Sequence, residues 1–168
     1  MAFSMYQSTV PIYVKTLGNL AAILDKGAAF AAEKKIEPAV LLGYRLAPDM
    51  YSLTRQVQTA TDQAKRGAAR LAGVEAPVYE DKEATFAELK ARIDKTIAFV
   101  SSLKPAQIDG SETRDIALMV GGKSRMVPGQ TYLQHNALPN FFFHVTAAYA
   151  ILRHCGVPIG KSDYIGQY

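Results

Sequence analysis

A chain of 168 residues with 49% hydrophobic and 20% charged residues can bury one sizeable core, which predicts a single globular domain over residues 1–168. Nineteen basic against fifteen acidic residues give a net charge of +4, too small an excess to suggest nucleic acid as a partner. A lone cysteine excludes an intramolecular disulfide, and no apolar run or secretory signal pattern suggests a membrane, so we expect a cytoplasmic protein.

The N-terminal part of the chain has the pattern of an amphipathic helix. We expect it to start at Ser8 or Thr9 with Pro11 in its first turn, where a missing N–H costs little. Gly27 is a place where this helix kinks or ends, before a further Ala-rich helical stretch. A short connecting helix is then expected over residues 41–46.

Helical spacing is clearest between residues 50 and 71, where apolar or small residues recur every three or four positions. They are Leu53, Val57, Ala60, Ala64, Ala68 and Leu71. Asp49 is expected to cap this second long helix, because an aspartate there satisfies free N–H groups. Lys65, Arg66 and Arg70 form the densest basic group, which we interpret as a solvated helix face; nucleic-acid binding there is a third hypothesis.

A third helix is expected over residues 85–102, with Arg92 on its polar face. Two short runs around Gly121-Gly122 then predict a β-hairpin near residues 116–127. A short helical turn leads to a last helix that has Pro139 in its first turn, and residues 161–168 form a tail. The sequence therefore predicts an all-α, up-and-down four-helix bundle with a small inserted β-hairpin.

His144 lies in the middle of the nearly all-apolar last helix, so it must be hydrogen-bonded, metal-bound or chemically active. A satisfied core histidine and a ligand are both open interpretations. His154 lies about 15 Å further along this helix and faces about 80° away, so the two rings cannot share one ion. Any metal would need Asp, Asn or Gln co-ligands, which the second helix and its start offer. These residues are Asp49, Gln56, Gln58 and Asp62.

Three stretches of the chain resemble an uncharacterised bacterial family, the domain of unknown function 1993, which is grouped with the DinB/YfiT-like metalloenzymes. They are residues 138–161 (beginning LPNFFFH), 45–50 (RLAPDM) and 69–73 (ARLAG). The resemblance covers almost the whole chain and implies an up-and-down four-helix bundle that is often dimeric. Metal-binding members place one histidine on the second helix and a His-x-x-x-His pair on the last.

On this resemblance, His144 is the second member of that pair, and Asn140 stands at the position of the first. The second-helix ligand position falls near Gln56 or Gln58, where no histidine exists. We therefore expect a pocket for a small molecule around His144, bordered by Asn140, Asp49, Gln56 and Gln58.

No cofactor is expected at this pocket, because only one of the three family metal ligands is kept. If a divalent metal such as zinc or nickel binds, His144 would hold it. The resemblance also implies an alternative, a metal-dependent transferase that uses a low-molecular-weight thiol. Whether the protein is an enzyme stays open, and a homodimer is expected.

Overall fold

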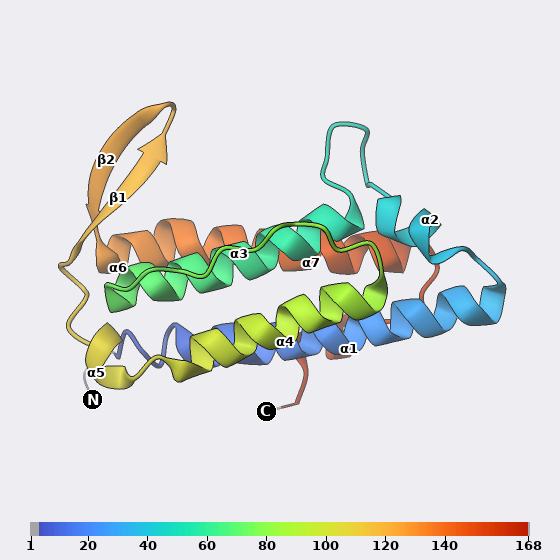
Figure 1. The fold of residues 1–168 in the computed structure, drawn as a ribbon, viewed down its shortest axis with the longest axis horizontal. Helices are drawn as coiled ribbons and strands as arrows, with labels where there is room; N and C mark the ends of the chain where they lie inside the picture. Colours follow the sequence, from blue (N-terminus) through green and yellow to red (C-terminus); the bar gives the residue numbers. More distant parts are fainter. Residues whose placement is uncertain (1–3, 168) are drawn as a thin grey trace.

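The computed structural model describes residues 4–167, which are mostly helical with one small two-stranded antiparallel sheet (Figure 1). The longer helices are α1 (Val10–Lys34), α3 (Leu53–Ala72), α4 (Phe86–Ser102) and α7 (Leu138–His154). The shorter ones are α2 (Pro38–Gly43), α5 (Pro105–Ile108), α6 (Gly129–Tyr132), the π-helical segment η1 (Leu133–Ala137) and α8 (Lys161–Ile165). No described helix has the length and apolar character that crossing a membrane requires.

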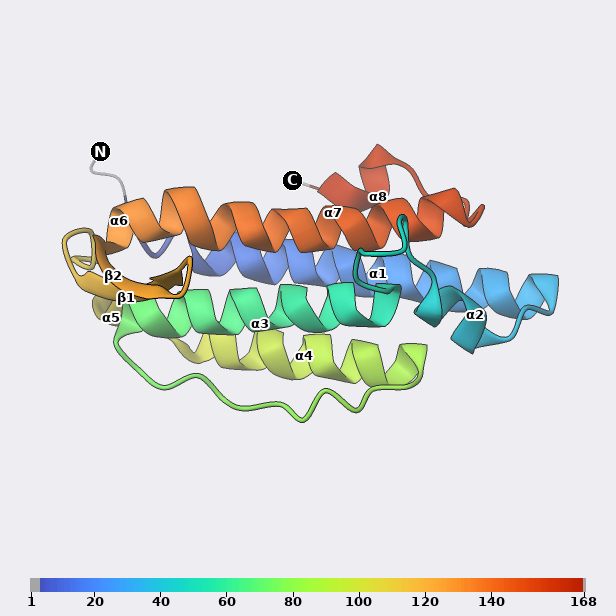
Figure 2. The ribbon, with the colours of Figure 1, turned by 90° about the horizontal axis from the view of Figure 1, so that it is seen from above.

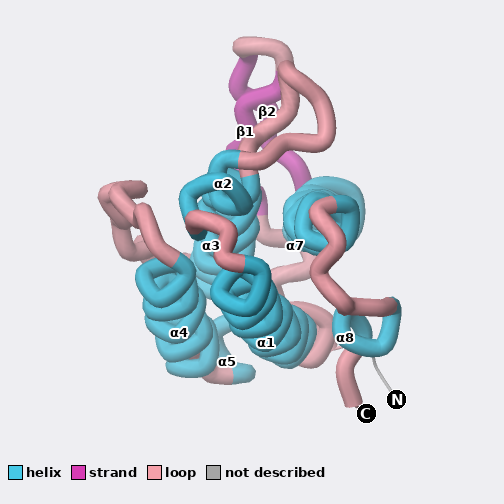
Figure 3. The backbone as a smooth tube through the Cα atoms, turned by 90° about the vertical axis from the view of Figure 1, so that its right-hand side faces the viewer, coloured by secondary structure: helices cyan, strands magenta, loops and turns pink. Residues whose placement is uncertain are grey.

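The four longer helices lie side by side, with α3 packed against both α4 and α7 (Figures 1 and 3). Helices α1 and α7 run in one direction, and α3 and α4 run in the other (Figure 2). This corrects the alternating up-and-down order that the sequence predicted. The connection over residues 73–85 returns along the length of α3, which an extended chain can do because it advances about 3.3 Å per residue against 1.5 Å in a helix.

Helix α1 begins at Val10 with Pro11 in its first turn, as predicted, and it continues through Gly27 to Lys34. The expected kink or end at Gly27 is therefore wrong, and the Ala-rich stretch belongs to the same helix. A Cβ atom on Gly27 would lie 3.1 Å from a methyl group of Leu152. Glycine at this position lets α1 approach α7 closely.

The predicted apolar face of α3 is confirmed, since all six of its residues are fully buried. The predicted cap is wrong, because the Oγ of Ser52 accepts the bond from the backbone N–H of Arg55. Asp49 lies three residues earlier, in an exposed loop that Arg45 closes by donating to the carbonyl oxygen of Met50. Helix α2 spans Pro38–Gly43, slightly before the expected position.

The predicted hairpin is confirmed. Strand β1 (Asp115–Val120) pairs antiparallel with β2 (Lys123–Pro128), and Gly121 and Gly122 both have positive φ angles, 58° and 77°. A two-residue primed turn requires this conformation. Ile116 and Leu118 are buried against the helices. The hairpin stands at the end of the molecule where α3 finishes (Figure 1).

The last helix, α7, has Pro139 in its first turn and ends at His154, as predicted, whereas the expected tail differs. The expected short helical turn before α7 is formed by α6 and η1, which continue into α7 without a break. Proline has no N–H and its ring crowds the carbonyl four residues back, and the wider π turn just before Pro139 accommodates both effects. The expected tail contains α8, where Asn19 donates to the carbonyl oxygen of Tyr164 and Lys26 pairs with Asp163.

Candidate functional site

The candidate site is built around the buried imidazole of His144 on α7. Its Nδ1 lies 2.7 Å from Oε1 of Gln56 on α3. The amide nitrogen of Gln56 donates to the carbonyl oxygen of Tyr51 at 3.3 Å, which leaves Oε1 as the acceptor facing the ring. Nδ1 of His144 therefore carries the proton in the neutral ring, and the lone pair is on Nε2.

The surroundings of His144 favour this uncharged form. Burial lowers the pKa of His144 below its ordinary value of 6.5, so the ring is neutral at pH 7. The ring of Tyr51 lies nearly parallel to the imidazole, with centroids 6.1 Å apart, and the ring of Phe143 meets it edge-on at 5.3 Å. A neutral imidazole with its Nδ1 proton bonded to Gln56 can accept a hydrogen bond or a proton at Nε2.

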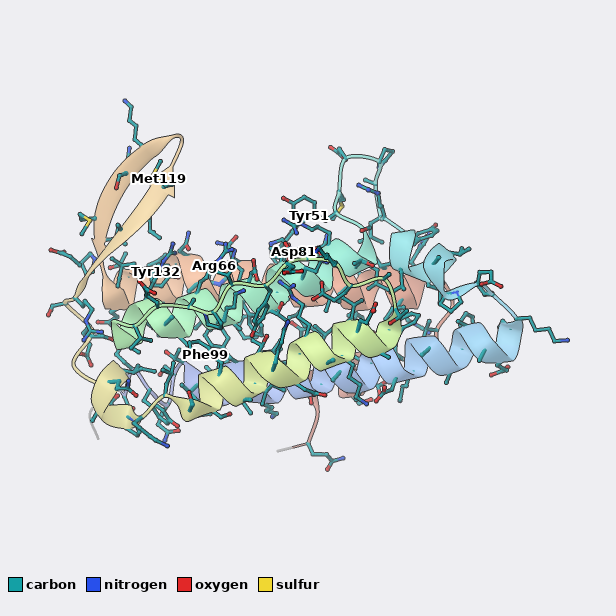
Figure 4. All side chains as sticks on the ribbon, viewed as in Figure 1. Tyr51, Arg66, Asp81, Phe99, Met119 and Tyr132 are labelled. Carbon is teal, nitrogen blue, oxygen red and sulfur yellow. The ribbon has the colours of Figure 1, made fainter. Side chains whose placement is uncertain are left out.

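A pocket of about 230 Å³ opens beside this ring. Its walls come from the loop before α3, from α3 and from α7, and its lining residues are Asp49, Met50, Tyr51, Gln56, Phe143 and His144. A second pocket of about 350 Å³ shares Met50 and Phe143 with the first and continues over apolar residues such as Leu46 and Ala147. Figure 4 places Tyr51 above the start of α3, on the rim of this region. The two pockets together offer one polar end and one apolar end.

The structure brings together three of the five predicted pocket residues: His144, Gln56 and Asp49. The other two lie elsewhere. Gln58 donates to Glu83 at 2.9 Å, and Asn140 donates to the backbone oxygen of Asn136 at 2.9 Å. Asn140 is one helical turn before His144, and it lines a different groove, beside the hairpin.

The sequence analysis missed a buried ionic cluster between α3, α4 and the connection over residues 73–85. The guanidinium of Arg92 has no exposed surface and forms ion pairs with Asp62, Asp81 and Glu83 at 2.8, 2.7 and 3.1 Å. Lys65 is also buried, 2.9 Å from Asp62. The prediction that Lys65 lies on a solvated face is therefore wrong, and the polar face on which Arg92 was placed is buried at that residue.

One local signal could have revealed part of this cluster. Asp62 precedes Lys65 and Arg66 by three and four residues, the spacing of ion pairs within a helix, and Asp62 bonds to both cations. The acidic residues of the connection gave no such signal, because their partner Arg92 lies on a separate helix. Tyr79 covers the cluster, with Nζ of Lys65 3.6 Å from the centre of its ring.

Comparison with known proteins identifies the family. The family model for a domain of unknown function (DUF1993) matches residues 5–165. The chain belongs to the DUF1993 family. It is also 42% identical to a DinB family member from Shewanella denitrificans whose crystal structure superposes with a TM-score of 0.89, covering 97% of this chain and 92% of that one. No curated protein matches.

In this DUF1993 chain, the residues near His144 do not fit the three-histidine metal site that the resemblance implied. Among residues 4–167, no group of three His, Cys, Asp or Glu side chains could hold an ion. Gln56 already bonds to Nδ1 of His144. The side-chain atoms at the pocket that could still bind a metal are Nε2 of His144 and the carboxylate of the exposed Asp49. His154 lies elsewhere, 3.1 Å from the hydroxyl of Tyr44, so the two histidines of α7 do not converge.

Proposed function

We propose that this DUF1993 protein is a DinB-like four-helix bundle that binds a small, flat, uncharged molecule in the pocket beside His144. The ligand carries an O–H or N–H group that donates to Nε2 of His144. The single observation that carries the proposal is the chain of hydrogen bonds from His144 through Gln56 to the Tyr51 backbone. This chain fixes the ring and leaves one acceptor available.

Three further features support a ligand of this kind. The aromatic rings of Tyr51 and Phe143, which both line the pocket beside the imidazole, offer flat apolar contacts. The adjoining apolar pocket has room for a hydrophobic substituent. Ligand sites in proteins commonly combine apolar walls with a few oriented polar groups, and this pocket has that composition.

Phenol is a suitable first probe, because it is flat and has one O–H donor. We expect phenol to shift the amide NMR signals of Tyr51, Gln56 and Phe143, and toluene, which lacks the donor, to shift them much less. In His144→Asn the two probes should become similar, whereas the exposed His154→Asn control should behave as wild type. Equal binding of phenol and toluene to the wild-type protein would contradict the proposal.

The metal-dependent thiol transferase is the alternative outcome. Elemental analysis of protein purified without a histidine tag tests it directly. Near-stoichiometric zinc or nickel in the wild-type protein that is lost in His144→Ala would contradict a metal-free binding pocket and favour a metal centre at His144. A metal content that is low and unchanged by the substitution supports the small-molecule proposal.

We also propose that the protein acts as a cytoplasmic homodimer. The exposed side chains of Leu46 and Phe143, 41% and 58% accessible, lie beside the apolar pocket and support an association surface there. Light scattering measures the assembly, and Leu46→Ser should shift it toward monomer if this surface is used.

A further inference from the structure

A second groove lies between the β-hairpin and the helices, at the opposite end of α3 from its first turn. Its volume is about 300 Å³, and β1, β2, α3, η1 and α7 all contribute to its lining. Figure 4 shows Arg66 on α3, Tyr132 at the start of the last helical stretch and Met119 on the hairpin, all at this end of the molecule. The groove shares no lining residue with the pocket of His144.

The charge of this groove is positive. Arg66 and Arg70, one helical turn apart on α3, both line it, and none of the described lining residues is an Asp or Glu. Arg70 donates to the hydroxyl of Tyr132 at 3.3 Å and lies over that ring, and no carboxylate of the described residues pairs with it. An arginine has five N–H donors, and the exposed side chain of Arg70 uses one of them for the Tyr132 hydroxyl.

The charge of Arg66 is compensated only in part. Its guanidinium lies 2.9 Å from Asp62, but the same carboxylate also binds Lys65 at 2.9 Å and Arg92 at 2.8 Å. Arg92 on α4 is also paired with Asp81 and Glu83, so on α3 it is Lys65 and Arg66 that depend on the one carboxylate of Asp62. Of these cations Arg66 is the one that lines the groove, and together with Arg70 it would attract an anion there.

Neutral polar groups complete the groove. The amide side chains of Gln63, Asn136 and Asn140 line it together with Ser124 of the hairpin. The amide nitrogen of Asn140 uses one N–H to bond the backbone oxygen of Asn136, which leaves its second N–H as a donor. Arginines and amide donors around one cavity match the acceptors of a phosphate or carboxylate group.

We propose that this groove binds the phosphate or carboxylate group of a small molecule, with Arg66 and Arg70 as the charged donors. The hairpin forms the wall that encloses the ligand, through Ala117, Leu118 and Met119. This assigns a role to Arg66 and Arg70 of α3 and to Asn140, none of which lines the pocket of His144.

The test is an NMR titration of isotope-labelled protein with sodium phosphate and, in parallel, with sodium succinate, at constant ionic strength maintained with sodium chloride. We expect saturable shifts at Leu118, Ser124 and the amides near Arg70 with at least one of the two anions. The stronger anion then identifies whether phosphate or carboxylate is preferred.

Variants distinguish a site from general attraction to a basic surface. Arg70→Gln and Asn140→Asp should each weaken binding by about tenfold, since one removes a charged donor and the other adds a negative charge. The control Arg153→Gln changes an exposed arginine near the end of α7, outside the groove lining, and should leave the dissociation constant unchanged. Melting temperatures verify that each variant is folded.

Three results would overturn the proposal: shifts that stay linear with both anions, equal weakening by the control, or tight binding of a short oligonucleotide in place of both small anions. The oligonucleotide result would favour nucleic-acid binding at Arg66 and Arg70. Such binding weakens steeply with salt. Because His144→Asn should leave the phosphate titration unchanged, this proposal and the function proposed for the His144 pocket can fail separately.

Discussion

At the scale of single residues, the contact between Tyr13 and Gly67 is one of the close approaches in the core. Tyr13 is completely buried, its ring meets Phe141 edge-on at 4.8 Å, and its hydroxyl has no hydrogen-bond partner among the described residues. Burial raises the pKa of this hydroxyl. A Cβ atom on Gly67 would lie 2.5 Å from the hydroxyl oxygen of Tyr13, so a larger residue at position 67 would displace the Tyr13 side chain or the backbone of α3.

Tyr13→Phe should raise the free energy of unfolding by about 1 kcal/mol, because it removes a buried polar group that forms no bond. Gly67→Ala should lower it by about 1–3 kcal/mol through overpacking, and by less when Tyr13→Phe is also present. Urea unfolding followed by circular dichroism measures all four proteins of this double-mutant cycle. Strict additivity of the two changes in unfolding free energy would show that the Tyr13 hydroxyl does not cause the cost of a larger residue at position 67.

At the scale of elements, the connection over residues 73–85 is fixed to α3 and α4 by charge rather than by apolar packing. Asp81 binds both Arg55 and Arg92, and Glu83 binds both Arg92 and Gln58. Val78 of the same connection is 93% exposed. The extended connection that allows α3 and α4 to run in the same direction therefore depends strongly on one buried guanidinium.

Arg92→Met should lower the free energy of unfolding by about 3–5 kcal/mol, because it leaves three carboxylates without their shared cation. Lys82→Met is the matched control: Lys82 lies in the same connection, is 80% exposed and pairs with Glu80 at the surface. Its loss should cost no more than about 1 kcal/mol. Chemical unfolding measures both variants, and similar losses for the two would mean that the Arg92 cluster adds little stability.

At the scale of the whole molecule, stability should decrease in two steps on acidification. Burial lowers the pKa of His144 below 6.5, so below that pH the unfolded chain binds more protons than the folded one, and the free energy of unfolding falls. For Asp81, burial would raise the pKa, but the hydrogen bonds and charges of Arg55 and Arg92 outweigh it and hold the pKa below 3.8. The carboxylate therefore contributes a second loss at more acidic pH.

We expect the wild-type protein to lose stability between about pH 7.5 and pH 5.5, and His144→Asn to lose less over the same interval. Urea unfolding at the two pH values, compared within each protein, isolates this effect from the hydrogen bond that the substitution removes. An equal pH dependence in the two proteins would show that another group titrates there.

The sequence by itself determined the helices, the hairpin turn and the inward position of His144. Helix and strand periods, proline and glycine positions and capping residues are properties of a few neighbouring residues, so the apolar face of α3, the start of α4 and the Gly121-Gly122 turn could all be predicted. A single imidazole within an apolar helix is a signal of the same local kind.

Tertiary structure alone decided which residues meet. Gln56 and His144 are 88 positions apart. Gln56 rather than Gln58 is the partner because the face of α3 that carries Gln56 packs against α7. Arg92 is buried because a distant connection brings two carboxylates over it, a compensation that no local pattern contains. Local patterns follow from short-range geometry, whereas the partner of a buried polar group depends on how whole elements pack together.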